Sequence, residues 1–458
     1  MTSATASSAI FALAFGFPLL GACGSDGDNA GALEPDASID GSEGAPGTDG
    51  SVVDGGIPDA AAGTPYIVSN AVGDQWVLQR AKSTNGHVAY DYHPQVMYDA
   101  GTWRMWWCGY DPAGKGGDHI LYAEATDAEF AARFWHAHGS HVQNSFNDLL
   151  GSRGVNNPAF FDARDTCDPS VIRVGGTYYL YYGGTPLTGA GGYVAPGHAT
   201  PGTVGTYIGV ATSSDGFTFT RQNKGNPIVE ASNIYGKSYG AGEATVVHKV
   251  DADGVARFYL SYYDTTGIAG VHYYLLRSSD PTFQTNVESF VTGATGPSSR
   301  TWVARTHENQ TAAAGIGSMQ YHDQLDTWIS IGASVTHFYA GNLSTVDEVY
   351  APFSFASLDY TAFHHRDHDS FARDPEGHAL VSAAPAPGCT AIPLAHFTGA
   401  IATTPMGAAC TKDADCAMPT GTYACDAQTL HCFDNDIYRT DLVMSRATLN
   451  VGRACPAE

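Results

Sequence analysis

The sequence is poor in charged residues, and positive charge is the scarcer kind. Only 15% of the 458 residues are charged, and 22 Lys and Arg stand against 46 Asp and Glu, which gives a formal net charge of -24. Nowhere do basic residues form a run. Because phosphate groups are bound by clustered Lys and Arg, this composition argues against a nucleic-acid partner. A neutral, aromatic-lined site for sugars or other polyols fits the composition better.

Extended helical periodicity is also missing from the chain. Gly, Tyr and Phe are abundant instead, with 53, 25 and 20 residues. This composition is typical of many short strands joined by tight turns, and it predicts an all-β fold. The length allows two or three domains and a large core.

The N-terminal apolar stretch has no Lys or Arg before it, and it is too short to cross a membrane. Ile10 to Leu20 nevertheless fits the h-region of a signal peptide, and Leu20 to Cys23 resembles a bacterial lipobox. We therefore predict a lipoprotein-type signal peptide over residues 1–23. Residues 24–64 have almost no large apolar side chain, so we expect a disordered linker rich in Gly, Asp, Ala and Ser. The protein would be exported, either secreted or held at the outer membrane or cell surface by its lipid anchor alone.

Cysteine is scarce in the body of the chain and concentrated near its end. Six of the nine lie in the C-terminal part: Cys389, Cys410, Cys416, Cys425, Cys432 and Cys455. In an exported chain this pattern favours a small disulfide framework. Zinc is the competing interpretation, but there is no CxxC pair and His431 is the only well-placed imidazole. We expect residues 401–458 to form a Cys-rich tail with a structural or adhesive role.

A repeat of seventy-five residues runs through the middle of the chain. His93, Asp168, Glu243 and Ser318 recur at this interval, and each opens or precedes a related pattern, the first two being HPQVMYDAGTWRMWW and DPSVIRVGGTYYLYY. A further strand follows each of the first three copies. Three or four antiparallel strands per unit are what a propeller blade requires. We predict a five-bladed β-propeller over residues 65–400.

The fifth blade is expected to run from Tyr350 to Phe397. Two segments are candidates for the strand that closes it, Asp441 to Val451 in the tail and Trp76 to Ala81 near the N-terminus.

Asp168 and Glu243 hold equivalent positions in neighbouring repeats, so they should converge on one mouth of the propeller channel. Two carboxylates across a cavity are the minimum machinery for glycoside hydrolysis, because one protonates the leaving oxygen while the other activates water or attacks the sugar. Either residue alone is more often structural, Asp168 as a turn cap before Pro169 and Glu243 as a solvated side chain. Because their positions in the repeat match, we treat a catalytic role for the pair and a structural role as equally supported hypotheses.

The motifs DPSVIRVGGTYYLYYGG, YIGVATSSDGFTFTR and YGAGEATVVHKV resemble five-bladed propeller glycosidases of the family 43 type, over roughly Tyr90 to Ser334. The resemblance implies an inverting mechanism with an Asp base, a second Asp that tunes pKa and position, and a Glu acid. By position, Asp168 resembles the tuning Asp and Glu243 the acid. His93 stands where the base is expected. The implied substrate is a polysaccharide or oligosaccharide, with arabinose- or xylose-containing chains as first candidates.

Three explanations of His93 are open. Asp91 lies two residues earlier and would point to the same side of a strand, so it is the preferred base. His93 could itself act as base or bind substrate. The base could also be lost, which would leave a non-catalytic glycan-binding surface lipoprotein. A relative that transfers glycosyl groups to phosphate is a further alternative to the hydrolase that we favour.

Further residues are expected around this site. Trp107, Tyr182 and Tyr239 are candidates, with His93, for binding substrate, since aromatic faces stack on sugars. No cofactor is required, but related propellers sometimes hold a cation on their axis, and His337 is the candidate ligand for a structural Ca2+.

Two His-rich stretches and one cysteine pair complete the expectations. Residues 136–141 and 363–369 match no metal-site spacing and are expected to be loops at the propeller mouth. Cys108 and Cys167 are expected to form a disulfide between neighbouring blades rather than remain buried thiols. We expect a monomer.

Overall fold

The computed structural model describes the following residues: 66–78, 91–110, 118–132, 135–137, 159–187, 192–194, 205–230, 240–265, 271–293, 296–305, 318–323, 326–331, 336–340, 343, 350–353, 363–380, 389–402, 423–425, 432–434 and 440–452. The predicted signal peptide and linker lie outside this set. Within it, no helix has the length and apolar character that a membrane span requires.

The described chain is all-β with antiparallel sheets, as predicted. Its strands form five sheets of four or five strands and one two-stranded ladder. The first sheet contains β2 (Asp91–Asp99), β3 (Thr102–Tyr110), β4 (Asp118–Thr126) and β5 (His136–Ala137). The second contains β6 (Asp165–Val174), β7 (Thr177–Thr185), β8 (Tyr207–Ser213) and β9 (Thr220–Arg221). The third contains β10 (Ala241–Val250), β11 (Ala256–Thr265), β12 (Val271–Ser278), β13 (Glu288–Gly293) and β14 (Gly296–Ala304).

The fourth sheet contains β15 (Ser318–His322), β16 (Thr327–Ile331), β17 (Thr336–Ala340) and β18 (Tyr350–Phe353). The expectation that a fifth unit begins at Tyr350 is therefore wrong by one strand, because β18 pairs with β17 as the outer strand of the fourth unit. The short helices α1 (Asp127–Ala132) and η1 (Asn223–Gly225) lie in connections. The small ladder joins β21 (Tyr423–Cys425) to β22 (Cys432–Asp434) and places Cys425 opposite Cys432.

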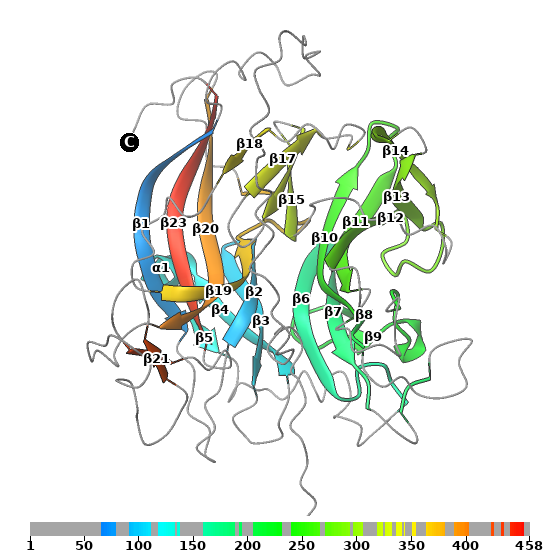
Figure 1. The fold of residues 1–458 in the computed structure, drawn as a ribbon, viewed down its shortest axis with the longest axis horizontal. Coiled ribbons are helices and arrows are strands. Elements are labelled where there is room, and N and C mark those ends of the chain that lie inside the picture. Colours follow the sequence, from blue (N-terminus) through cyan, green and yellow to red (C-terminus); the bar gives the residue numbers. More distant parts are fainter. Residues whose placement is uncertain are drawn as a thin grey trace, which may run out of the picture.

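The fifth sheet combines strands from both ends of the chain. Its order is β1 (Tyr66–Leu78), β23 (Thr440–Gly452), β20 (Cys389–Ala402) and β19 (Phe363–Phe371). Figure 1 shows β1 in blue beside β23 in red. The candidate closing segment Asp441 to Val451 lies within β23, and the described part of the other candidate, Trp76 to Leu78, lies at the end of the neighbouring β1. The His-rich segment 363–369 forms strand β19, not the predicted mouth loop.

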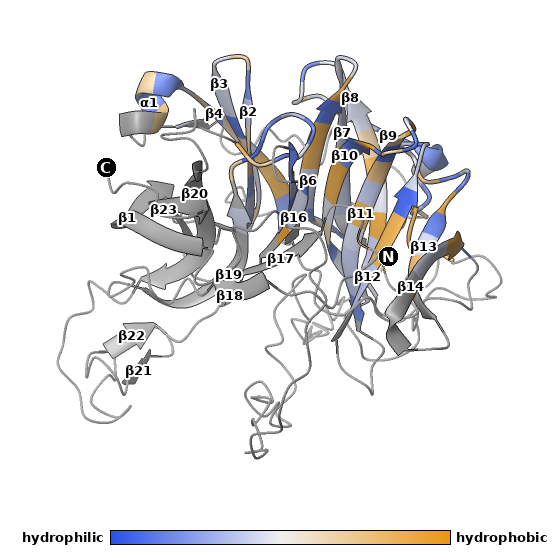
Figure 2. Ribbon diagram, turned by 90° about the horizontal axis from the view of Figure 1, so that it is seen from above, coloured by the Kyte–Doolittle hydropathy of each residue, from blue (hydrophilic) through white to orange (hydrophobic). Residues whose placement is uncertain are grey.

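The inner strands of the sheets lie next to one another in a row. β19 contacts β2, β2 contacts β6, β6 contacts β10, and β10 contacts β15. Apolar side chains fill the spaces between successive sheets: Met97 and Trp106 of the first pack with Leu180 of the second, and Ile172 of the second packs with Leu260 of the third. Figure 2 shows hydrophobic residues along β6, β7, β10 and β11, where the second and third sheets face each other.

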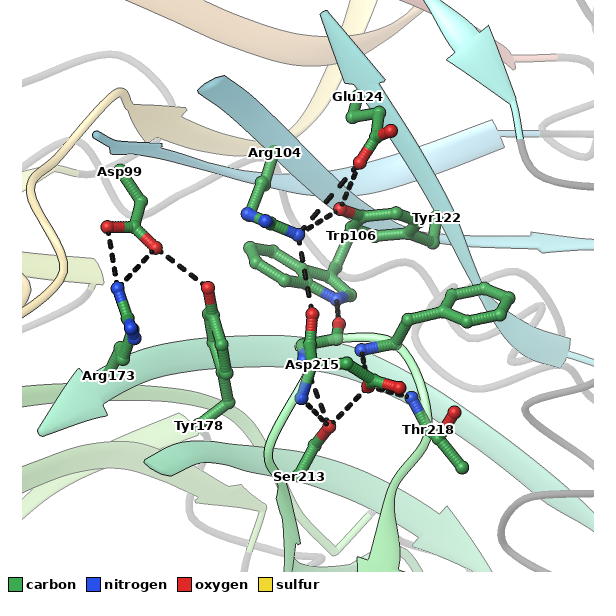
Figure 3. Close-up of polar contacts among 12 residues, drawn as sticks. Asp99, Arg104, Trp106, Tyr122, Glu124, Arg173, Tyr178, Ser213, Asp215 and Thr218 are labelled. Carbon is green, nitrogen blue, oxygen red and sulfur yellow. Dashed lines mark hydrogen bonds and ion pairs between the residues drawn. The ribbon is translucent and has the colours of Figure 1, made fainter. Parts of the chain in front are cut away.

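Polar contacts also connect the first and second sheets (Figure 3). The Asp99 carboxylate accepts hydrogen bonds from Arg173 at 3.0 Å and from the Tyr178 hydroxyl at 2.7 Å. Trp106 donates its indole N–H to the carbonyl of Gly216 at 3.0 Å. These contacts set the relative position of β2 and β6.

The predicted disulfide between Cys108 and Cys167 is present. It joins β3 to β6, with 5.0 Å between the two Cα atoms, and therefore ties the first sheet to the second covalently.

A segment that follows β19, residues 372–380, crosses the inner strands of the first four sheets. Its backbone pairs in turn with Tyr98 of β2, Arg173 of β6, His248 of β10 and Tyr321 of β15, over N–O distances of 2.6–2.9 Å. We call these residues the crossing segment. Because it bonds β2, β6 and β10 toward their C-terminal ends, the opposite end of the inner strands is the one that holds His93, Asp168 and Glu243.

Candidate active site

The same backbone irregularity occurs in the inner hairpins of the first three sheets. The antiparallel register breaks between Tyr92 and Gln95, between Cys167 and Ser170, and between Gly242 and Thr245. The first residue inside each break has a left-handed backbone conformation: φ is 48° at His93, 51° at Asp168 and 49° at Glu243. Each is a β-bulge with one extra residue on the inner strand. The backbone φ angle at these positions therefore repeats at the same seventy-five-residue interval as the sequence pattern.

Left-handed backbone is unfavourable for these side chains. A non-glycine residue held in a sparsely populated region costs about 1–3 kcal/mol, and such residues cluster at functional sites, where bulges often aim a side chain. Three of them at equivalent positions are hard to attribute to local turn preference. The fifth sheet repeats the register break between Asp367 and Ser370, which puts His368 at the corresponding backbone position.

The three bulged residues meet around the Asp168 carboxylate. His93 contacts it through Nδ1, 2.8 Å from Oδ1, and the backbone N–H of Glu243 donates to Oδ2 at 3.3 Å. Asp168 is fully buried, His93 is 8% exposed, and Glu243 is half-buried. Asp168 therefore joins the first and third sheets through contacts at both of its oxygens.

The contact with Asp168 orients the imidazole ring of His93. An ionised carboxylate can only accept, so Nδ1 is the donor in this contact. Gly183 leaves space for this arrangement, since a Cβ at that position would lie 3.1 Å from Asp168 Oδ2.

Residues just beyond the bulges repeat a second inter-sheet contact. The side-chain oxygen of Gln95 accepts from the Val171 N–H at 2.7 Å, and Ser170 Oγ accepts from the Val246 N–H at 3.0 Å. Each contact links one inner strand to the next at the same step of the repeat. The repeat interval itself could have revealed this set, because Gln95, Ser170, Thr245 and Gln320 are spaced by seventy-five residues.

Asp91 lies in β2 opposite Gly109, and its side chain falls outside the described residues. The alternation argument that placed it beside His93 is weakened, because alternation requires regular strand angles and His93 has a positive φ. Its role as base stays a prediction.

Two of the expected substrate-binding aromatics are in the core. Trp107 is fully buried against Val96 and Met105, and Tyr182 is fully buried with its hydroxyl donating to Asp162 at 2.8 Å. The prediction that a sugar stacks directly on either ring is therefore wrong. Tyr182 packs between the first and second sheets, whereas Trp107 packs with β2, β4, α1 and Ala372, so neither ring is open to substrate.

Tyr239 lies outside the described residues, and His337 is described only as a backbone position in β17, opposite Ser330. Among the described side chains, the potential metal-ligand atoms of Cys108, Asp118 and Cys167 lie within 4.8 Å of one another. The disulfide uses both sulfurs, so this group does not fit a metal site.

One buried cation near the site was not foreseen. Arg373, the second residue of the crossing segment, is 3% exposed and donates to Ser170 Oγ at 2.7 Å and to the Val246 carbonyl at 3.1 Å. No repeat or motif in the sequence distinguishes this arginine, because the crossing segment has no counterpart in the other units.

No family model matches the chain, and no curated protein does. Several solved structures are similar to it, and three of these are glycoside hydrolases of different families. The first is a family 117 enzyme from the marine bacterium Zobellia galactanivorans, with 10% identity and a TM-score of 0.40, covering 84% of this chain and 92% of that one. The α-L-arabinofuranosidase PaAbf62A from Podospora anserina, in complex with cellotriose, has 11% identity and a TM-score of 0.40, covering 85% and 98%. A thermostable family 43 glycoside hydrolase has 12% identity and a TM-score of 0.38, covering 70% and 87%.

Proposed function

We propose that this chain is an exported, inverting glycoside hydrolase on a five-bladed β-propeller, acting on a polysaccharide or oligosaccharide. The observation that carries the proposal is the set of three equivalent bulges, which bring His93, Asp168 and Glu243 together from three sheets. Five sheets with adjoining inner strands support the blade count. Arabinose- and xylose-containing chains are the first substrates to test, on the strength of the sequence motifs.

Burial divides the two carboxylates into different roles. Asp168 is fully buried and bonded at both oxygens, which suits a residue that positions others better than one that attacks substrate. Glu243 is half-buried, and its backbone is held by Asp168. It is therefore the general acid of this proposal, which donates a proton to the leaving oxygen.

Activation of water falls to one of two side chains. Asp91 is the predicted base, because the resemblance implies an Asp and Asp91 lies two residues before His93. The structure adds a reason to test His93, since its Nδ1 lies 2.8 Å from the Asp168 carboxylate, and a carboxylate in this position orients an imidazole for acid–base chemistry. Glycan binding without cleavage is the second candidate function, and it would follow from loss of the base.

Export is part of the same proposal. The lipobox-like Leu20 to Cys23 supports it, and so does the buried Cys108–Cys167 disulfide, because such bonds persist in oxidising compartments.

The acid assignment is tested with Glu243→Gln on aryl glycosides and on arabinan and xylan. General-acid catalysis typically contributes about 10²–10⁴-fold, so the variant should lose this much rate on polysaccharide and much less on aryl glycosides with a good leaving group. Glu129→Gln, on α1 at the edge of the first sheet, is the control and should retain activity. Equal losses on both substrate types would contradict the acid role. Oligosaccharide binding with no turnover by the wild type would favour the glycan-binding function instead.

A further inference from the structure

A small cavity lies on the axis of the inner strands, beside the bulged residues. Each of the five sheets supplies at least one polar residue to its wall, the first sheet supplies two, and the crossing segment supplies one more: His93, Gln95, Ser170, Thr245, Gln320, Ser370 and Arg373. It offers about 10 Å3 to the centre of a water-sized sphere. This is room for one water molecule or one monatomic ion.

The wall of this cavity carries an uncompensated positive charge. Arg373 is 3% exposed, and among the described residues no carboxylate lies within ion-pair distance of its guanidinium. Burial lowers the pKa of Arg373 to about 10, and the charge of the adjacent Asp374 offsets only part of this effect. A buried charge without a partner is strongly unfavourable.

Two N–H donors on the wall lack an acceptor. Within the described part of the chain, neither Nε of Arg373 nor Nε2 of Gln95 has a hydrogen-bond partner, although both atoms are buried. The orientation of the Gln95 amide is fixed by its oxygen, which accepts from the Val171 N–H at 2.7 Å. Leaving such a donor unsatisfied costs about 1–3 kcal/mol, and more for a charged group.

We propose that this cavity binds one small monovalent anion, of the chloride or bromide type, through Arg373 and the Gln95 amide. An anion would accept hydrogen bonds from both donors and would also neutralise the guanidinium charge. A water molecule could accept the hydrogen bonds but would leave the charge uncompensated. The room available suits a monatomic anion better than sulfate, phosphate or a sugar carboxylate. The proposal does not rest on the hydrolase activity, because the anion would be held by Arg373 and Gln95 and not by Glu243 or a substrate, although His93 lines the same cavity.

The same wall does not fit the expected axial Ca2+. Calcium takes six to eight oxygen ligands with carboxylates among them, whereas no carboxylate lines this cavity and a guanidinium does. His337 lies in a different strand, β17, and its own candidacy as a ligand is unaffected.

The test measures thermal unfolding of the full chain in sodium chloride, sodium bromide and sodium gluconate at constant ionic strength. An anion that binds only the folded protein raises the midpoint with concentration. Chloride and bromide should raise it by a few degrees in a saturable manner, and gluconate should not. Crystals grown in bromide should show an anomalous peak in the cavity between Arg373 and Gln95. Equal responses to all three salts, or a cavity without bromide, would overturn the proposal in favour of an ordered water.

Gln95→Glu gives a sharper comparison. The new carboxylate keeps an acceptor for the Val171 N–H and supplies the missing negative charge, so the variant should fold, lose the halide response and bind no bromide. Gln284→Glu makes the same charge change at an exposed position and should keep the full response. A Gln95→Glu protein that retains the halide response would refute the site. If that variant does not fold, the bromide peak in the wild type still decides.

Discussion

At the scale of single residues, the chemistry of the site depends on how the sheets constrain a few side chains. His93 replaces the carboxylate expected at its repeat position, yet it contacts the carboxylate of the next repeat at 2.8 Å. The carboxylate beside His93 is therefore the one that Asp168 supplies from the second unit. Sequence equivalence alone could not reveal this pairing, because the left-handed bulge, and not the strand alternation, sets the direction of both side chains.

Two conservative variants should distinguish His93 from Asp91 as the base. If His93 activates water, His93→Gln should lower kcat by about 10²–10⁴-fold, while Asp91→Asn should have a small effect. If Asp91 is the base, the losses should be reversed. Steady-state kinetics on arabinan and xylan provides the measurement, with the configuration of the first product followed by NMR. Full activity in both variants would exclude both residues.

At the scale of elements, the repeat explains the inner strands and leaves the crossing segment unexplained. Strand order within the units follows from the pattern that recurs in the sequence, and the Cys108–Cys167 pairing was expected because both cysteines lie beside that pattern. The three bulges fall at the repeated positions but were not predicted. The crossing segment occurs only once in the sequence, so no recurring pattern predicts it. Its fit depends on Gly377, whose φ of 88° and close approach to β10 leave no space for a side chain: a Cβ would lie 2.8 Å from the Val246 carbonyl oxygen.

Gly377→Ala should destabilise the protein by more than backbone strain alone. The substitution imposes a positive φ on alanine and also forces the crossing segment away from β10, for a total of about 2–3 kcal/mol. Gly254→Ala is a matched control, because Gly254 has a φ of 79° with no atom within 4 Å, so only the strain of about 1 kcal/mol applies. Denaturant unfolding measures both. Equal losses would show that the close approach contributes nothing.

At the scale of the whole molecule, the all-β class and the repeating sheets were accessible from composition and the seventy-five-residue interval. The fifth sheet was accessible only in part, because β1 and β23 come from opposite ends of the chain and share no motif with the other units, so each could be named only as a candidate closing strand. Trp107 and Tyr182 were misplaced for a related reason. Sequence alternation distinguishes two faces of a strand, but neighbouring elements can cover both faces, so an aromatic residue on an inner hairpin need not reach the channel.

The disulfide between the first and second sheets should matter for both stability and activity. Its cysteines are 59 residues apart, and closing a loop of this length in the unfolded chain contributes about 4 kcal/mol in the chain-entropy model. The double variant Cys108→Ala/Cys167→Ala should lose up to this amount in denaturant unfolding, without burying a new hydroxyl group. Because His93 and Asp168 come from the two sheets that the bond joins, activity should also decline at temperatures below global unfolding. The single variant Cys425→Ala, in the small ladder, is the control and should leave the site unaffected. Unchanged unfolding of the double variant would mean that the noncovalent contacts of Asp99, Trp106 and Gln95 suffice to hold the sheets together.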